Sequence, residues 1–172
     1  MADPLLQADY SRCAALCCVV LPFDKSVAFG FSKAADEPCR HLAADLRCTI
    51  HDRLAQGFAG CIAFDCHGAG QRVTQQVFGG VTWRDNRALM SRMEAAFRAM
   101  RKLHEAGLLL EEAGKLPLSP EQAAEGRRLV GALDLGRDRD EAELAGLEPA
   151  QILLKVRSFL AGLRDLRGLS RR

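Results

Sequence analysis

The chain has 172 residues, 48% of them hydrophobic and 27% charged, with a formal net charge of +2 at pH 7. This length suits one domain with a sizeable core, or a small domain followed by a second one. Residues 1–70 carry six Lys or Arg against eight Asp or Glu, and residues 71–172 carry eighteen against fourteen. Neither half is basic enough to favour nucleic-acid binding over a solvated surface.

The cysteines are confined to the N-terminal part of the chain. All seven lie between residues 13 and 66, and none follows. Cysteines that merely fill a core would be scattered, so this segregation indicates a dedicated chemistry: metal binding first, then redox thiols. The candidate metal ligands are Cys13, Cys17, Cys18, Cys39, Cys48, Cys61 and Cys66.

The N-terminus lacks the features of a secretory signal. Residues 2–10 contain two Asp and no Lys or Arg ahead of the apolar run 14–23, whereas a signal peptide needs positive charge there. No stretch reaches the roughly 18–20 apolar residues that span a bilayer. We therefore expect a cytoplasmic protein without membrane contact, in which thiols stay reduced. An odd number of cysteines also fits a disulfide framework poorly.

The N-terminal half predicts short elements only. Residues 9–20 favour one or two helical turns behind a cap at Asp9 or Ser11. Residues 27–31 and 46–50 favour two short strands that pair with each other. Irregular connections dominate, and a region with so few large apolar residues needs an internal cross-link such as a metal.

Residues 67–84 are rich in glycine and polar residues and form the end of this half. The spacing Gly68-x-Gly70 is interpreted as a structural turn. A dinucleotide fingerprint would need a preceding buried strand and a third glycine at the required offset, and neither is evident.

The C-terminal half has the period of amphipathic helices. Apolar residues recur at steps of three and four over 85–112, where Gly107 is expected to bend or shorten the helix. A second helix, 119–133, begins with Ser119 as cap, Pro at the first position and Gln three residues on. A third helix, 149–166, carries one apolar stripe. Short loops between amphipathic helices predict an antiparallel three-helix bundle.

Cysteine is a soft ligand that suits zinc and iron. A structural zinc site takes four ligands, commonly cysteines with or without histidine, so seven thiols exceed one site and could supply two. On a helix Cys13 and Cys17 share a face while Cys18 points about 100° away. The adjacent pair therefore indicates two metals close together, or one ligand beside a structural or redox thiol. The spacing leaves zinc, iron and an iron–sulfur cluster open. Histidines near the cysteines are candidate ligands or neighbours of ligands: His41, His51 and His67.

Four motifs recur in a fixed order along residues 13–66: Cys13-A-A-L-Cys17-Cys18, Cys39-R-H-L, Cys48-T-I-H-D-R and Cys61-I-A-F. In this order they resemble the bacterial cysteine-cluster family of the YkgJ type. The resemblance implies a zinc- or iron-chelating domain. Residues 67–84 and the helical tail are similar to the N-terminal part of a bacterial subgroup in which this domain precedes pentapeptide repeats.

Together these observations predict an α+β fold, mostly α. Residues 1–84 should form a small irregular cysteine-cluster metal-binding domain, and residues 85–172 a helical domain. The leading hypothesis is a cytoplasmic metal-binding protein that chelates zinc or iron through thiolates, with the helical region available to a protein partner. Two alternatives stay open: an iron-dependent enzyme or redox protein acting on a peptide or thiol, and an interaction module stabilised by metal. No residue is singled out as catalytic.

Overall fold

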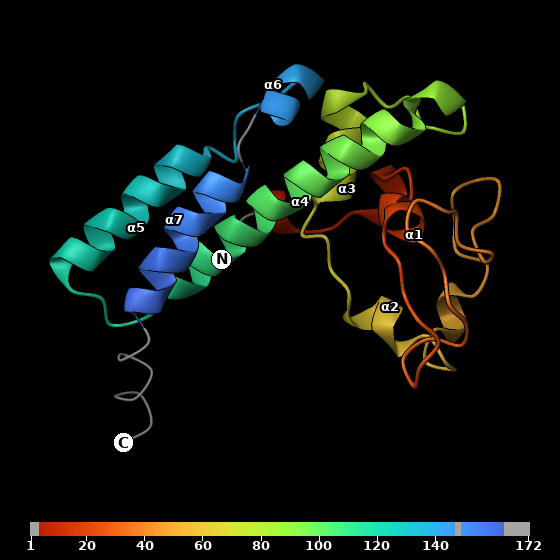
Figure 1. Cartoon of the computed structure of the whole chain (residues 1–172), viewed down its shortest axis with the longest axis horizontal. Helices are drawn as coiled ribbons and strands as arrows, with labels where there is room; N and C mark the ends of the chain where they lie inside the picture. Colours follow the sequence, from red (N-terminus) through yellow and green to blue (C-terminus); the bar gives the residue numbers. More distant parts are fainter. Residues whose placement is uncertain (1–3, 147–148, 164–172) are drawn as a thin grey trace.

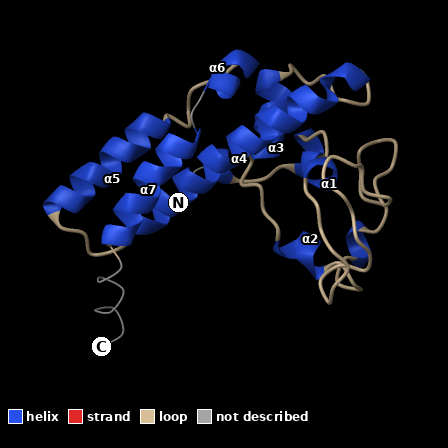
Figure 2. Ribbon diagram, viewed as in Figure 1, coloured by secondary structure: helices blue, strands red, loops and turns tan. Residues whose placement is uncertain are grey.

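The computed structural model describes residues 4–146 and 149–163. As predicted, the protein is mostly helical, and loops are concentrated in one part of the molecule (Figure 2). Extended strands are absent from the described ranges, where β structure is limited to isolated bridges. The helices are α1 (Leu16–Val20), α2 (Ala59–Ala63), α3 (Ala69–Arg72), α4 (Met90–Ala113), α5 (Pro120–Leu133), α6 (Glu141–Gly146) and α7 (Pro149–Gly162), with shorter turns η1 (Pro4–Leu6), η2 (Tyr10–Arg12), η3 (His51–Arg53), the π-helical η4 (Val73–Val77) and η5 (Arg87–Leu89).

Helix α4 is the longest element, with 24 residues, and helices α1, α3, α5, α6 and α7 pack against it, whereas α2 lies apart from it among the loops (Figure 1). The turn η5 leads directly into α4. The Asn86 side chain caps this turn by accepting a hydrogen bond from the Ala88 N–H. Helix α4 continues past Gly107 to Ala113, so this glycine does not shorten it, which is one of the two effects that the sequence predicts. A Cβ at this position would collide with Leu135, so the glycine instead admits a neighbouring segment close to the helix.

The helices that pack against α4 contact different parts of it. Helix α3 and η4 lie beside its N-terminal half, whereas α5 and α7 lie beside its C-terminal half and also contact each other (Figure 1). Helix α5 begins with the predicted capping box, in which Ser119 and Gln122 each accept a hydrogen bond from the other's backbone N–H. The predicted continuation of α7 over residues 164–166 lies outside the described residues. No helix in the described part of the chain is long and apolar enough to cross a bilayer.

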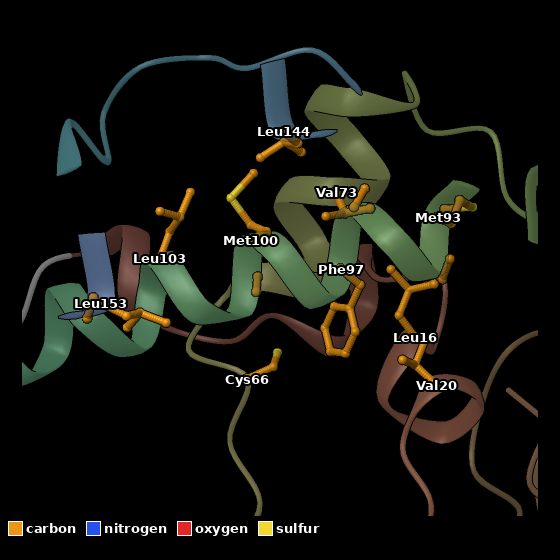
Figure 3. Packing of buried hydrophobic residues seen from close by; sticks show 14 of the residues in the cluster. Leu16, Val20, Cys66, Val73, Met93, Phe97, Met100, Leu103, Leu144 and Leu153 are labelled. Atoms are coloured by element: carbon orange, nitrogen blue, oxygen red, sulfur yellow. The ribbon is translucent and has the colours of Figure 1, made fainter. Parts of the chain in front are cut away.

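One cluster of buried apolar side chains runs along α4 and receives residues from both halves of the sequence (Figure 3). Leu16 and Val20 of α1 join Met93 and Phe97 of α4 in this cluster, and Leu153 of α7 lies toward its other end. Helix α1, which carries the adjacent cysteines, is therefore fixed to the core of the helical part. The division at residues 84 and 85 stays a prediction.

Residues 21–65 are built differently. None of their apolar side chains is buried, and Lys33 is the one buried residue of this segment. The strands predicted at 27–31 and 46–50 do not form, because each segment closes on itself in a turn. Phe23 pairs with Lys33 in one turn, and Leu42 pairs with Cys48 in another.

Candidate functional site

Two adjacent cysteines, Cys17 and Cys18, lie on the short helix α1. The helix follows Ala15, whose left-handed backbone (φ 53°) reverses the chain direction. Leu16 and Val20 on the same helix are fully buried, so both thiols are carried by an element that the core holds in place. The two sulfur atoms are 4.0 Å apart, within hydrogen-bonding distance for thiols.

The two neighbouring thiols differ in acidity. The hydrogen bond between them, together with burial, raises the pKa of Cys17 well above its usual value. The same hydrogen bond lowers the pKa of Cys18 to about 7, and the ammonium of Lys33 also lowers it. A thiol with this pKa is substantially ionised at neutral pH, and the thiolate is the form that binds metals.

Cys13, Cys17 and Cys66 form a group that we call the inner cysteines, since they lie closest to the helical core. Cys17 interacts electrostatically with both of the others. Burial raises the pKa of Cys13 to about 11, against the opposing effect of the Leu16 backbone N–H, and Cys66 adds to the rise. Cys13 fits closely against α3, because a Cβ at Gly70 would lie 2.5 Å from its sulfur. The inner cysteines thus lie on or beside the starts of α1 and α3.

Cys39, Cys48 and Cys61 form a second group, the outer cysteines, carried by the loop segment. Burial raises the pKa of Cys61 to about 11, and the thiols of Cys18, Cys39 and Cys48 raise it further. The backbone supports this grouping: the Cys39 N–H donates to the Cys18 carbonyl at 2.9 Å, and Cys48 pairs with Leu42 across a tight turn. Cys18 therefore links the two groups, with Cys17 facing the inner cysteines and Cys18 the outer ones.

Aromatic rings hold together the loops that carry the outer cysteines. Rings from three separate turns contact one another at centroid distances of 4.4 to 5.6 Å: Phe23, Phe29, Phe31, His41 and Phe58. The Arg40 guanidinium lies 3.7 Å from the Phe31 ring centroid. The Gly60 N–H donates to the Ala28 carbonyl at 3.2 Å, which ties the residue before Cys61 to the first turn.

The histidines have mostly structural surroundings. His41 contacts Phe31 and Phe58 edge-on, and His51 is exposed at the start of η3. His67 has a left-handed backbone (φ 50°), and its Nδ1 lies 3.7 Å from the Asp65 carboxylate. His104 is completely buried on α4, with its Nδ1 hydrogen-bonded to the His67 carbonyl. His104 therefore serves packing, and the roles of His41, His51 and His67 as ligands or neighbours of ligands stay predictions.

The sulfur atoms interact without forming a closed coordination shell. Among residues 4–146 and 149–163, no three side chains of His, Cys, Asp or Glu are gathered tightly enough to hold a metal ion. None of the seven cysteines is in a disulfide. Metal binding would therefore require the cysteine side chains to turn toward one another.

Lys33 is the residue that sequence reasoning missed. Its side chain is 7% exposed, and its Nζ donates to the carbonyls of Val19 at 2.8 Å, Ala34 at 2.9 Å and Glu37 at 2.8 Å. Val19 directly follows Cys18, and Glu37 lies two residues before Cys39. Nothing local in the sequence distinguishes this lysine from the exposed Lys25, because the acceptors come from separate segments.

The chain is partly similar to a known protein. No protein-family model matches the chain, and no solved structure matches it. The chain is 43% identical over 109 residues to the uncharacterized protein YybG of Bacillus subtilis strain 168. The match covers 63% of this chain and 39% of that relative, so the chain spans about two fifths of the relative's length. The relationship supports a shared ancestry over this part and leaves the activity to be inferred from the residues.

Proposed function

We propose that the protein binds a zinc or iron ion through cysteine thiolates, and that Cys18 with the outer cysteines forms the principal site. The observation that carries the proposal is the composition of the loop segment. Residues 21–65 contain the outer cysteines and bury no apolar side chain. A segment of this kind has little hydrophobic free energy to offset its loss of conformational entropy.

A bound metal would supply the missing stabilisation. Structural zinc sites contribute roughly 10–16 kcal/mol of binding free energy at neutral pH, and that free energy becomes folding free energy. Zn–S bonds of about 2.3 Å in a tetrahedron place the sulfurs about 3.8 Å apart. Cys18 and the outer cysteines come from four positions along the chain and influence one another's pKa. The proposal requires their side chains to rotate to this spacing.

The donor set is consistent with soft, thiophilic metals. Four thiolates without a carboxylate favour zinc or iron over magnesium or calcium, which prefer oxygen. Backbone N–H groups are directed at two of the candidate ligands, those of Leu16 and Ala15 at Cys13 and that of His41 at Cys39. Such hydrogen bonds stabilise the charged sulfur that a metal needs. The resemblance to the YkgJ-type cysteine-cluster family over residues 13–66 supports the same assignment.

The inner cysteines favour a second candidate function, that of an iron-dependent enzyme. Cys13, Cys17 and Cys66 make three thiols, one fewer than a closed tetrahedral site, and catalytic metal sites keep an open position. The Tyr10 hydroxyl lies in the same electrostatic neighbourhood, where burial raises its pKa and Asp65 and Cys66 raise it further. An iron ion held there would have room for a peptide or thiol substrate. If the protein is an iron-dependent enzyme, we propose that this is its active site.

We also propose that the chain has two domains. Residues 1–84 would form the metal-binding domain, and the helices of residues 85–172 a three-helix bundle that packs on it and presents its outer face to a protein partner. If metal serves folding alone, the protein is an interaction module without turnover. The proposal requires reduced thiols, which is the state maintained in the cytoplasm.

The test is the metal content of protein purified without air. We expect at least one equivalent of zinc or iron per chain, with visible absorption if the species is an iron–sulfur cluster. Cys48→Ser should lose one equivalent, because it removes an outer ligand. Val27→Ser is the matched control in the same segment, since Val27 is fully exposed, and it should keep its metal. Wild-type protein without stoichiometric metal under these conditions would contradict the proposal.

A further inference from the structure

A cleft opens on the helical side of the molecule, between the end of α5, one turn of α4 and the N-terminal turn η1. Its volume is about 480 Å³. Pockets of roughly 300–1,000 Å³ are the usual sites of small organic ligands. No cysteine lines this cleft, which we call the α4–α5 cleft. Three of its lining residues are glycines, and the other six are Leu6, Glu111, Val130, Leu133, Asp134 and Leu135.

Two buried arginines hold the wall of the cleft that follows α5. Arg72 of α3 donates hydrogen bonds to the carbonyls of Leu135 and Arg137. Arg139 donates to the carbonyl of Leu133 at 2.6 Å, at the end of α5. Both arginine side chains are buried, so these bonds are shielded from water. The backbone on this side is therefore fixed before a ligand arrives, which lowers the entropy lost on binding.

Glycines leave space in the lining of the cleft. Nothing lies within 4 Å of the place that a Cβ would take at Gly131 or at Gly136. On α4, Gly107 and Glu111 share one face, because they are four residues and about 6 Å apart along the helix axis. The cleft is thus about one helical turn long on this side. An extended peptide advances about 3.3 Å per residue, so this length suits a small molecule better.

The lining combines four apolar side chains with two carboxylates, Glu111 and Asp134, and contains no Lys or Arg. Glu111 has no close ion-pair partner in the described part of the chain. Lys115 Nζ lies 4.0 Å from its Oε1 and pairs more closely with Glu112. Glu111 Oε2 is buried and has no hydrogen-bond partner among the described residues. A carboxylate in these surroundings is stabilised by a cationic hydrogen-bond donor.

We infer that the α4–α5 cleft binds a small primary amine in its ammonium form, with its charge beside Glu111 and Asp134 and its apolar body on the leucines of the lining. Hydrogen bonds between ammonium and carboxylate are roughly twice as strong as neutral ones, so they set the orientation of the ligand. Removal of the apolar body from water supplies the remaining affinity. This site is separate from the proposed metal site, and its occupation does not require metal.

The charge preference is tested with hexylamine, hexanol and hexanoate at pH 7. These probes have apolar chains of similar length and differ in charge. Titrations of ¹⁵N-labelled full-length protein are followed by NMR. We expect hexylamine to bind at least about 10-fold more tightly than the other two and to shift the amide signals of Gly107, Gly131 and Gly136. Equal affinity for hexylamine and hexanol, or no binding of hexylamine at millimolar concentration, would overturn the inference.

Three variants test the position of the site. Glu111→Gln keeps the shape of the side chain without its charge and should weaken hexylamine binding roughly 10-fold. Glu105→Gln, a partly exposed carboxylate of α4 that does not line the cleft, should bind hexylamine like wild type. Val130→Lys places an ammonium in the lining at a side chain that is 52% exposed, and it should also weaken binding, because like charges repel.

Circular dichroism shows whether each variant is folded. Folded Glu111→Gln that binds hexylamine as tightly as wild type would overturn the inference. If this variant does not fold, unchanged hexylamine affinity of Val130→Lys would overturn it in the same way. Metal content is measured on the same samples. Loss of amine binding in protein that holds metal, or the reverse, shows which of the two proposals fails.

Discussion

Residues 21–65 and the helices packed along α4 are stabilised in different ways. Met93, Phe97 and Met100 of α4 are completely buried, and their neighbours on α1, α3, α5 and α7 complete a continuous apolar cluster. In residues 21–65 the buried residue is a lysine, and the apolar side chains that reach the core cluster are only partly buried: Leu21, Leu42, Leu46 and Phe64. Ring contacts and backbone hydrogen bonds across tight turns add to the order of this segment. The helical part is stabilised mainly by the burial of apolar side chains. The loop segment depends more on backbone hydrogen bonds and ring contacts.

The seven cysteines are divided between these two regions. Four of them are on or beside elements that the apolar core fixes, since Leu16 and Ala69 of these elements are fully buried. These four are Cys13, Cys17, Cys18 and Cys66. The outer cysteines are carried by the loops. In our proposal one side of the four-sulfur site is thus rigid and the other adapts to the metal. This difference predicts that removal of the metal will affect residues 21–65, whereas substitutions in the apolar core will also affect the helices.

Removal of metal should have the largest effect. A chelator applied to reduced, metal-loaded protein should release residues 21–65 from their fixed arrangement, because the binding free energy of about 10 kcal/mol or more is lost there. Limited proteolysis read by mass spectrometry should then show cleavage in residues 21–65 many-fold faster, while circular dichroism retains the signal of α4, α5 and α7. Readdition of zinc should restore protection. Simultaneous loss of helix and loop protection would show that the two regions are not stabilised separately.

A core deletion should act on both regions. Phe97→Ala removes a completely buried ring in the cluster that includes Leu16 of α1 and Ala69 of α3, and it should lower the free energy of unfolding by about 3–5 kcal/mol. Metal affinity should fall as well, because α1 loses its support. Leu129→Ala is the matched deletion on α5, where Leu129 is 3% exposed. It should cost about 2–5 kcal/mol in chemical denaturation and leave metal affinity unchanged.

The sequence predicted the helical region because its signals are local. The apolar period of α4 and the capping residues of α5 each involve residues a few positions apart, and the structure places helices at Met90–Ala113 and Pro120–Leu133. The predicted shortening at Gly107 was wrong, and the close approach of Leu135, which is distant in sequence, explains the glycine. A local pattern does not reveal which segment approaches a helix closely.

The loop segment was predicted less well for the same reason. The alternation in residues 27–31 indicated a strand, but Phe29 bonds back to Ser26 in a tight turn, and its ring stacks on Phe23. The cysteines were recognised as candidate ligands from their composition alone. Their division into inner and outer groups depends on contacts between distant residues. So does the burial of Lys33, and neither has a signature in the sequence.

A smaller effect should follow from filling the gap beside Cys13. Gly70→Ala places a Cβ 2.5 Å from the Cys13 sulfur, so the thiol must move. We expect a loss of about 1–3 kcal/mol in the free energy of unfolding, as for other overpacked sites, and slower alkylation or altered metal uptake at the inner cysteines. Gly131→Ala on α5 is the control, because nothing lies within 4 Å of a Cβ there. Denaturant titration should show it to be more stable than wild type by about 0.4–1 kcal/mol. Equal stability of the two variants would mean that Cys13 is loosely packed.

The smallest predicted effect concerns Glu94, where α4 faces the loop segment. Burial raises the pKa of this carboxyl, nearby Asp36 raises it further, and Oε1 is buried without a hydrogen-bond partner among the described residues. Because the pKa is higher in the folded state, ionisation destabilises the fold. The penalty is absent below the ordinary carboxyl pKa, grows as the pH rises through the raised one, and is complete above it.

Glu94→Gln removes that penalty by making the side chain neutral at every pH. At pH 7 the variant should be more stable than wild type by about 0.5 kcal/mol, the scale of changes away from the core. Below the ordinary carboxyl pKa the two proteins should unfold at the same denaturant concentration. Glu105→Gln, a partly exposed position on the same helix, is the control and should show no such pH-dependent gain. A gain that persists unchanged in acid would mean that Glu94 acts through packing. In that case the contact between α4 and the loop segment would not carry an electrostatic cost, and the two regions would differ only in their apolar burial.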